Sequence, residues 1–231
     1  MSTDAPNFEL CNKLLAETEY RPNLKDRYVG DVDPATKLRE GSGVYTYTNA
    51  FFQYQGQWHN GKKHTDQGEV STFVMRDGTK YAGQFLNGEI TGFGVKQFND
   101  GRVYQGEFLE GEMHGQGVLM YNPKRKGETD DTYEGQFHLN MRQGEGRLTR
   151  LNGDVFTGEF SNNHPNGHGS IHFHNGDYYT GEVVKGVMSG QGELVCSNAK
   201  CFRGQFENNQ LHGDGTFYVN GGPYNLTGVF N

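Results

Sequence analysis

The chain has 231 residues, of which 28 are Asp or Glu and 21 are Lys or Arg, so its formal net charge is −7. It contains 35 glycines, 13 tyrosines and 16 phenylalanines. This many aromatic residues exclude intrinsic disorder, the acidic balance excludes a general nucleic-acid binder, and the low aliphatic content excludes a thick globular core.

Residues 1–27 differ in pattern from the rest of the chain. Apolar residues recur there at helical spacing between Pro6 and Ala16: Phe8, Cys11, Leu14 and Leu15. This spacing predicts a short amphipathic helix. We expect the segment to cap the exposed first edge of the sheet that follows, with a flexible tail as the alternative.

Residues 28–231 form an array of repeats. Each unit opens with an aromatic residue followed two positions later by glycine, and the eight lead aromatic residues are Tyr28, Tyr54, Tyr81, Tyr104, Tyr133, Phe156, Tyr179 and Phe202. A second large side chain usually stands four positions after the lead, and a Gly-x-Gly pair usually opens eleven positions after it. A truncated ninth unit begins at Leu226. Such a fixed period is typical of repeat architectures.

Each unit is predicted to contain two short strands. Alternation in the first strand places the lead aromatic, the glycine and the second large residue on one face, and Gln or Glu on the other. This is the pattern of a half-buried antiparallel strand. Glycine in a strand marks a close approach, and the neighbouring aromatic rings are the expected occupants of that space.

The turns also recur at fixed positions. Seven residues after the lead stands a residue that tolerates a positive φ, and these are Gly61, Gly88, Gly111, Asn140, Asn163, Gly186 and Asn209. Asp77-Gly78 and three similar pairs between units predict two-residue hairpin turns. Because every connection is short, we predict an all-β fold: an elongated, twisted, single-layer antiparallel β-meander of about eight hairpins.

This frame resembles the MORN (membrane occupation and recognition nexus) repeat family. The resemblance covers Tyr28 to Phe230, although the first unit departs from the pattern at Val32 and Ala35 and the second after His64. It implies a single-layer sheet that acts as a scaffold or adaptor, often in cytoskeletal structures such as cilia, flagella and basal bodies.

Sequence motifs for catalysis are lacking, so we expect no enzyme, no catalytic residue and no cofactor. His168, His172 and His174 alternate along one strand and could share a metal, but we interpret them as solvated side chains and expect no metal site. Cys196 and Cys201 are expected to be free thiols. The start lacks a signal-peptide pattern, and no apolar stretch is long enough to cross a membrane, which favours a cytoplasmic location.

The aromatic face has no second layer to cover it, so either its rings cover one another or part of the face stays open. An open face would bind a helix or extended segment of a partner protein. The predicted partner-binding residues are Tyr54, Trp58, Tyr81, Phe85, Tyr104, Phe108, Tyr133, Phe137, Phe156 and Phe160.

The predicted function is therefore a non-catalytic scaffold in a cytoskeletal assembly, with the axoneme or basal body of a cilium or flagellum as the predicted location. The alternative is a peripheral membrane adaptor that recognises acidic phospholipids, for which the basic cluster Lys124 to Lys126 is the support and the net charge the objection. No nucleic acid is expected as a partner. The strand at Leu226 to Phe230 could also pair end to end with another copy.

Overall fold

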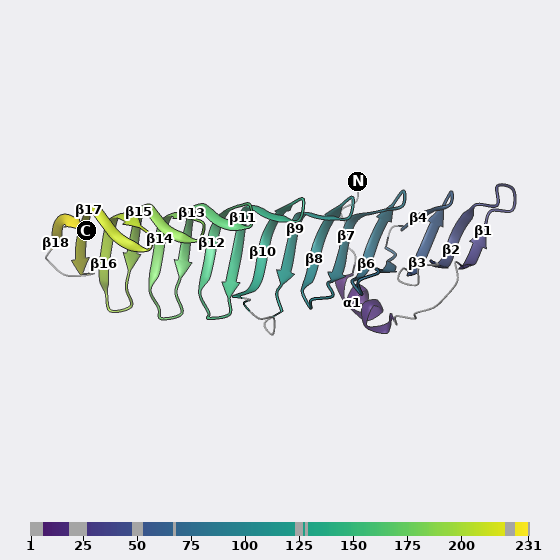
Figure 1. Ribbon diagram of the computed structural model, residues 1–231, viewed down its shortest axis with the longest axis horizontal. Helices are drawn as coiled ribbons and strands as arrows, with labels where there is room; N and C mark the ends of the chain where they lie inside the picture. The colour runs from purple at the N-terminus through teal and green to yellow at the C-terminus, as the bar shows by residue number, and fades with distance from the viewer. Residues whose placement is uncertain are drawn as a thin grey trace. The chain divides into compact units, whose positions relative to one another are not determined.

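The computed structural model describes residues 7–18, 27–47, 53–66, 68–122, 127, 129–219 and 225–230. The chain divides into two compact units, Met1–Asn122 and Pro123–Asn231, and each is described by itself. In both units the described residues are almost entirely β-strands (Figure 1).

The first unit contains one helix and an antiparallel meander. The elements are α1 (Phe8–Glu17), β1 (Arg27–Val32), β2 (Arg39–Thr46), β3 (Gln53–His59), β4 (Lys62–His64), β5 (Ser71–Val74), β6 (Lys80–Leu86), β7 (Glu89–Gln97), β8 (Val103–Leu109) and β9 (Glu112–Met120). Strand β3 pairs with both β4 and β5, so these two short strands are one interrupted hairpin arm. The interruption coincides with the extra residues after His64.

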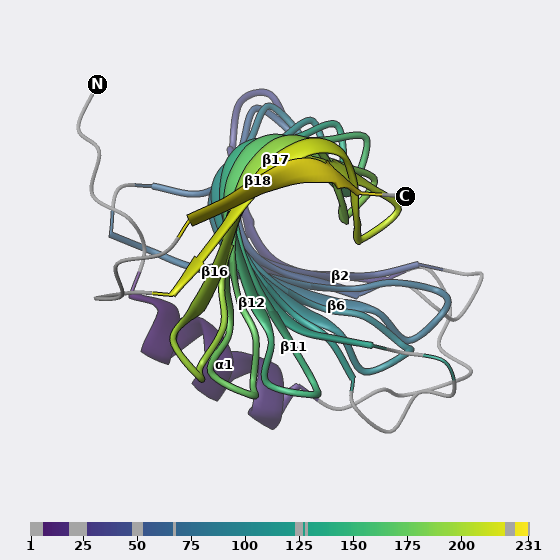
Figure 2. The same cartoon turned by 90° about the vertical axis from the view of Figure 1, so that its left-hand side faces the viewer.

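The second unit is a meander in which each strand pairs with the next along the chain. Its strands are β10 (Asp130–His138), β11 (Met141–Arg150), β12 (Val155–Ser161), β13 (His164–His172), β14 (Tyr178–Val184), β15 (Val187–Val195), β16 (Lys200–Glu207), β17 (Gln210–Val219) and β18 (Asn225–Phe230). The hairpins of this unit are bent rather than flat (Figure 2). The predicted all-β fold, a single-layer antiparallel meander of hairpins, is confirmed.

The turns within hairpins are two-residue turns of type I′, because both central residues have positive φ. Asn60 and Gly61 have φ of 50° and 78°, and Leu139 and Asn140 have 48° and 65°. The sequence predicted the second position of each turn but not the first. These turns match the right-handed twist of the strands they join.

The turns between hairpins correct the prediction of two-residue loops. Met75 donates its N–H to the carbonyl of Thr79 at 2.8 Å, and Gly78 donates to Met75 at 3.0 Å. The loop therefore has three residues, and only Gly78 has a positive φ, at 89°. A type I turn followed by a left-handed glycine is the usual form of such a three-residue loop.

A row of glycines crosses each sheet and supports the aromatic rings. Gly181 pairs with Gly192, and Gly192 pairs in turn with Gly204. A Cβ added to Gly192 would lie 2.4–2.6 Å from the hydroxyl and ring atoms of Tyr179. The ring therefore lies flat on the backbone of the glycine row, and any side chain at this position would displace it.

The rings also contact one another in edge-to-face geometry along each sheet. In the second unit the ring of Tyr133 lies 5.1 Å from Phe137 in its own repeat and 4.8 Å from Phe160 in the next. Tyr179 and Phe206 repeat the contact between units at 5.1 Å. This arrangement is a favoured one for aromatic pairs and is stabilising beyond the area buried. The core is thus a ladder of rings rather than a central cluster.

The Gln and Glu side chains opposite the rings have a structural role that the alternation pattern did not predict. In most hairpins the second arm bulges at the first glycine of the Gly-x-Gly pair, which exposes the next backbone N–H. Glu107 accepts that N–H from Gln116 at 2.8 Å, and Glu182 accepts it from Gln191 at 3.0 Å. These carboxylates satisfy a donor that the sheet leaves unpaired.

Helix α1 is found where the sequence predicts a helix, but it does not lie on the edge strand β1. It contacts β6 and β7 in the first unit (Figure 1). Cys11 and Leu15 pack on Ala82 and Val95, all four being buried. The reason is local: Ala82 and Val95 place small apolar side chains on the face that is otherwise polar, and the apolar side of the helix buries them.

Candidate functional site

The ten residues predicted to contact a partner all lie within the ring ladder and are buried. Their side chains are between 0% and 4% exposed. The rings cover one another and are closed off by the glycine row and by the second hairpin arm. Of the two alternatives that the sequence leaves open, the structure shows the one in which the rings cover one another, so these ten residues stabilise the sheet and are not exposed to a partner.

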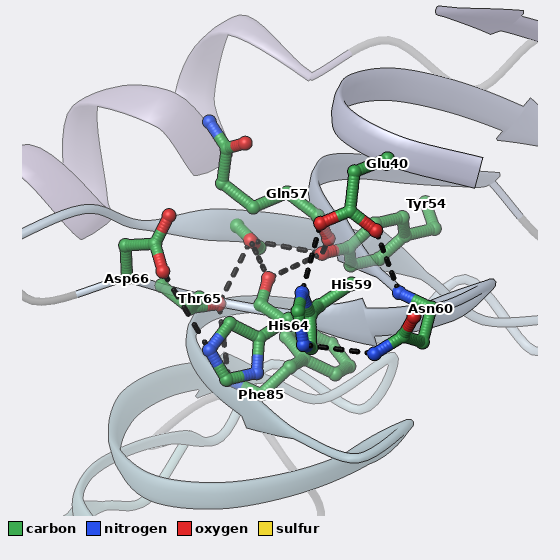
Figure 3. Close-up of polar contacts among 10 residues, drawn as sticks. Glu40, Tyr54, Gln57, His59, Asn60, His64, Thr65, Asp66 and Phe85 are labelled. Carbon is green, nitrogen blue, oxygen red and sulfur yellow. Dashed lines mark hydrogen bonds and ion pairs between the residues drawn. The ribbon is translucent and has the colours of Figure 1, made fainter. Parts of the chain in front are cut away.

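The tyrosine hydroxyls explain why most lead aromatics are Tyr rather than Phe. The hydroxyl of Tyr54 donates to the carbonyl of Gln57 at 2.6 Å and lies 2.9 Å from the carbonyl of His64 (Figure 3). Tyr179 donates in the same way to Glu182 at 2.8 Å. Burial raises the pKa of both tyrosines to about 12. A buried hydroxyl is tolerated only with such a partner.

Polar side chains join neighbouring hairpins at their turns in the same region of the first unit (Figure 3). Glu40 accepts the backbone N–H of Asn60 and contacts the ring nitrogen Nδ1 of His59, both at 2.8 Å. Thr65 accepts the backbone N–H of Phe85 at 3.0 Å. These contacts fix the register between hairpins, and they leave no group arranged as a nucleophile and base.

One further position of each repeat covers the rings on the side away from the glycine row. It stands nine residues after the lead aromatic, and in most units it is apolar, as in Ile90, Met113 and Met188. In three repeats a cation takes this place: the Lys63 ammonium lies 4.5 Å from the Phe73 ring centroid, the Arg142 guanidinium 5.5 Å from that of Tyr133, and, in the first repeat with its insertion, the Arg39 guanidinium 4.5 Å from that of Trp58. Burial lowers the pKa of Lys63. The rings stabilise these cations.

The accessible face of the second unit is the polar face, opposite the rings. It carries a groove of about 710 Å³ that crosses β11 to β16. The groove is lined by Glu145, Thr157, Glu159, His168, Ser170, Tyr178, Thr180, Gln191, Glu193 and Arg203, with the glycines of these strands at its base. We refer to these residues as the polar groove.

Charge in the polar groove is predominantly negative. Arg203 is the only Lys or Arg among its lining residues, and its guanidinium lies 3.0 Å from Glu193, which neutralises it. Hydrogen bonds from Tyr218 and Arg203 hold the pKa of Glu193 below its usual value. Glu145 and Glu159 remain exposed and carry the charge available to a partner. The groove therefore suits a segment that carries Lys or Arg.

In the first unit the corresponding face holds α1. Lys80 donates from Nζ to the carbonyls of Leu15 at 3.2 Å and Thr18 at 2.7 Å, which satisfies the end of the helix. Beside the helix a groove of about 830 Å³ extends over β2, β3 and β5. The polar face of this unit thus already binds a helix, through an apolar patch and one lysine.

The remaining predicted groups do not assemble into a reactive site. Among the described residues no three His, Cys, Asp or Glu side chains are placed to share a metal ion. His174 contacts Asp154 at 3.0 Å and does not form a ligand set with His168 and His172. Cys196 and Cys201 are free thiols. No helix within the described part of the chain has the length and hydropathy to span a bilayer.

Two other predictions stay predictions. The basic cluster Lys124 to Lys126 lies outside the described residues. Strand β18 pairs with β17 and exposes Leu226 and Val229, but pairing of this strand with another copy is not tested by the structure.

Two comparisons with known proteins bear on this chain, one with a solved structure and one with a family model. One similar solved structure is the TCP domain of SAS-4 (dCPAP) in complex with a proline-rich motif of Ana2 (dSTIL) from Drosophila melanogaster. The two sequences are 11% identical, and the alignment covers 73% of this chain and 88% of the SAS-4 chain, with a TM-score of 0.45. At that score the likeness carries no argument about function.

The family model described as MORN repeat matches eight segments, namely residues 37–49, 54–64, 81–101, 104–123, 133–155, 156–178, 179–199 and 202–222. These segments make up more than half of the chain and coincide with the hairpins of both units. The match includes the two N-terminal units whose sequences depart from the pattern. The chain belongs to the MORN repeat family.

Proposed function

We propose that this protein is a non-catalytic scaffold or adaptor whose polar groove binds a basic segment of a partner protein. MORN repeats form a non-enzymatic family of protein-binding or membrane-binding repeat proteins, which supports the scaffold role. We further propose a cytoplasmic, cytoskeletal setting such as an axoneme or basal body, from the family resemblance alone.

The observation that carries the proposal is the packing of α1. The polar face of the first unit buries a helix of this chain, whereas the same face of the second unit is open and bears the polar groove. The face can thus hold a second segment of chain, but the groove of the second unit has polar residues such as Thr157 and Thr180 in place of the apolar pair Ala82 and Val95, so its contacts with a partner would be polar and charged. The acidic lining then selects for positive charge, because like charges across an interface cost several kcal/mol.

Proximity labelling in the native cell tests this proposal, with the wild-type chain compared against Glu145→Lys. Glu145 is exposed, lines the polar groove and makes no side-chain hydrogen bond or ion pair with another described residue, so the substitution reverses a charge without breaking a polar contact. The expected result is a reproducible set of labelled partners with basic segments, whose labelling falls at least about tenfold in the variant.

Glu110→Lys is the matched control. Glu110 is an exposed turn residue with φ of 51°, and Lys185 occupies the same turn position in another repeat with φ of 52°. The control makes the same charge change outside the polar groove and should leave labelling unchanged. Equal labelling by wild type and Glu145→Lys, or no reproducible partner together with diffuse cytosolic staining, contradicts the proposal.

A further inference from the structure

The second unit has a basic pocket on the side of the sheet opposite the polar groove. The pocket has a volume of about 560 Å³ and lies where β10, β11 and β13 meet the β14–β15 turn. Its lining includes four basic side chains, Arg142, Arg150, His164 and Lys185, and a single acidic one, Asp130. In a chain with a net charge of −7, this concentration of positive charge is unexpected.

Three of the four basic groups have no polar partner among the residues that the structure describes. Arg142 pairs with Asp130 at 3.0 Å, and both side chains are largely buried, at 11% and 16% exposed. Arg150, His164 and Lys185 make no side-chain hydrogen bond or ion pair with any described residue. The Arg150 guanidinium extends to the β14–β15 turn, where Nη2 lies 3.4 Å from a Cβ built on Gly186. Arg150 thus extends toward the turn that carries Lys185, and the one acidic side chain of the lining, Asp130, is paired with Arg142.

The repeat frame shows that these residues are a local departure. Arg142 stands at the position that covers the rings, where most repeats have an apolar residue such as Ile90 or Met113 and the repeat that begins at Tyr54 has Lys63. Arg150 stands seventeen residues after its lead aromatic, where other units have Phe98, Tyr121, Phe173 or Cys196. The position of Arg142 accepts a cation over the rings, as Lys63 shows, and the Arg142 guanidinium is bonded to Asp130 and to the carbonyl of Asn163. Arg150 has no such role, so its place in the pocket requires a different explanation.

We propose that this pocket binds a phosphate group of a small soluble molecule. The pocket carries three permanent positive charges, from Arg142, Arg150 and Lys185, against the one negative charge of Asp130. A phosphate monoester carries about −1.5 to −2 charges near pH 7, which balances this excess, whereas a single carboxylate does not. Guanidinium groups bind phosphate oxygens in bidentate geometry, and Lys185 supplies a further donor.

The pocket floor is consistent with a ligand larger than phosphate itself. Leu148 and Pro165 are buried beneath it, and Leu151 lies at its rim. Its volume falls within the roughly 300–1,000 Å³ of small-molecule sites. The apolar floor therefore leaves room for the organic part of a phosphate ester.

Isothermal titration calorimetry of the full chain tests the proposal, with inorganic pyrophosphate and inositol trisphosphate as probes at roughly 0.15 M salt. Both probes should bind saturably. Arg150→Gln and Lys185→Gln should each weaken binding at least about tenfold, because each removes a charge-assisted contact. Neither side chain has a structural partner, so both variants should retain the wild-type circular dichroism spectrum and melting temperature.

Arg147→Gln is the matched control. Arg147 is on the same strand as Arg150 but on the polar face, where it donates to Thr149 at 3.3 Å. It should change binding less than twofold. Flotation with phosphatidylcholine vesicles, with and without phosphatidylinositol bisphosphate, separates the sources of the phosphate. Binding of soluble probes supports the proposal. Binding restricted to vesicles, no binding at all, or equal loss in Arg147→Gln overturns it, independently of whether a partner protein is found.

Discussion

Substitution of Gly192 by alanine tests the contact between the glycine row and the rings. Gly192 is in β15, opposite Gly181 and Gly204, and its φ is not in the left-handed region. An added Cβ would lie 2.4 Å from the hydroxyl oxygen and 2.5 Å from Cε2 of Tyr179. Because the backbone conformation suits alanine, the whole effect is steric.

The size of the expected loss of stability depends on how tightly the Tyr179 ring is packed. Tyr179 is fully buried, its hydroxyl is bonded to Glu182, and its ring contacts Phe206 at 5.1 Å. Overpacking of a well-packed site costs about 1–3 kcal/mol, and a ring held on all sides should be at the upper end. The unfolding midpoint should fall by roughly 6–12 °C, at about 2–4 °C per kcal/mol for a chain of this size.

Urea unfolding followed by far-ultraviolet circular dichroism measures the effect, and a double-mutant cycle assigns it. In the background Tyr179→Val the ring is absent, so Gly192→Ala should change the free energy of unfolding by less than about 0.5 kcal/mol. Gly228→Ala, at a site with nothing within 4 Å, is a second control and should be equally mild. If Gly192→Ala is neutral, or if its effect persists without the ring, the reasoning is refuted.

Three further predictions concern the tyrosines and the helix. Tyr179→Phe should destabilise the fold by about 1 kcal/mol in urea unfolding, because the Glu182 carbonyl loses its hydrogen-bond donor. The reverse substitution, Phe156→Tyr, should be neutral or stabilising, and the opposite order of stabilities would contradict the role of the hydroxyl. The free energy of unfolding should fall as pH rises from about 10 to about 12. Tyrosines in the unfolded chain ionise near pH 10, whereas Tyr54 and Tyr179 in the folded chain stay protonated until about pH 12. A constant free energy of unfolding over this pH range would refute the burial of these two tyrosines. Lys80→Met should increase the rate at which the buried Cys11 thiol is alkylated in native protein, because the end of α1 loses the two hydrogen bonds from Lys80. An unchanged alkylation rate would show that Lys80 does not hold the helix in place.

The hairpin array was predictable from sequence because its signals are local. Alternation over five residues assigns Tyr179 and Val183 to one face, and Asn at position 209 predicts a left-handed turn, as found with φ of 66°. The pairing of Gly30 with Gly43 shows that the first unit keeps this register despite its insertion. Each of these features depends only on neighbours within one repeat.

The accessible surface was not predictable in the same way, because it depends on contacts between repeats. The register of adjacent hairpin arms determines that Phe160 covers Tyr133. It also determines that Glu182 accepts a backbone N–H nine residues away in the sequence. The docking of α1 had a signal in the apolar residues Ala82 and Val95 on the polar face. The basic pocket also had a signal in the sequence, but this signal is seen only when the residues at equivalent positions of the repeats are compared.

The central claim is that the rings are buried and that, in the second unit, the opposite face is open. Tyr178 and Tyr179 are adjacent in β14 and lie on opposite faces: Tyr179 is fully buried in the ring ladder, whereas Tyr178 lines the polar groove. Hydroxyl-radical footprinting with mass spectrometry compares the two within one peptide. The account predicts oxidation of Tyr178 and protection of Tyr179 in native protein. Equal oxidation of both residues would contradict it.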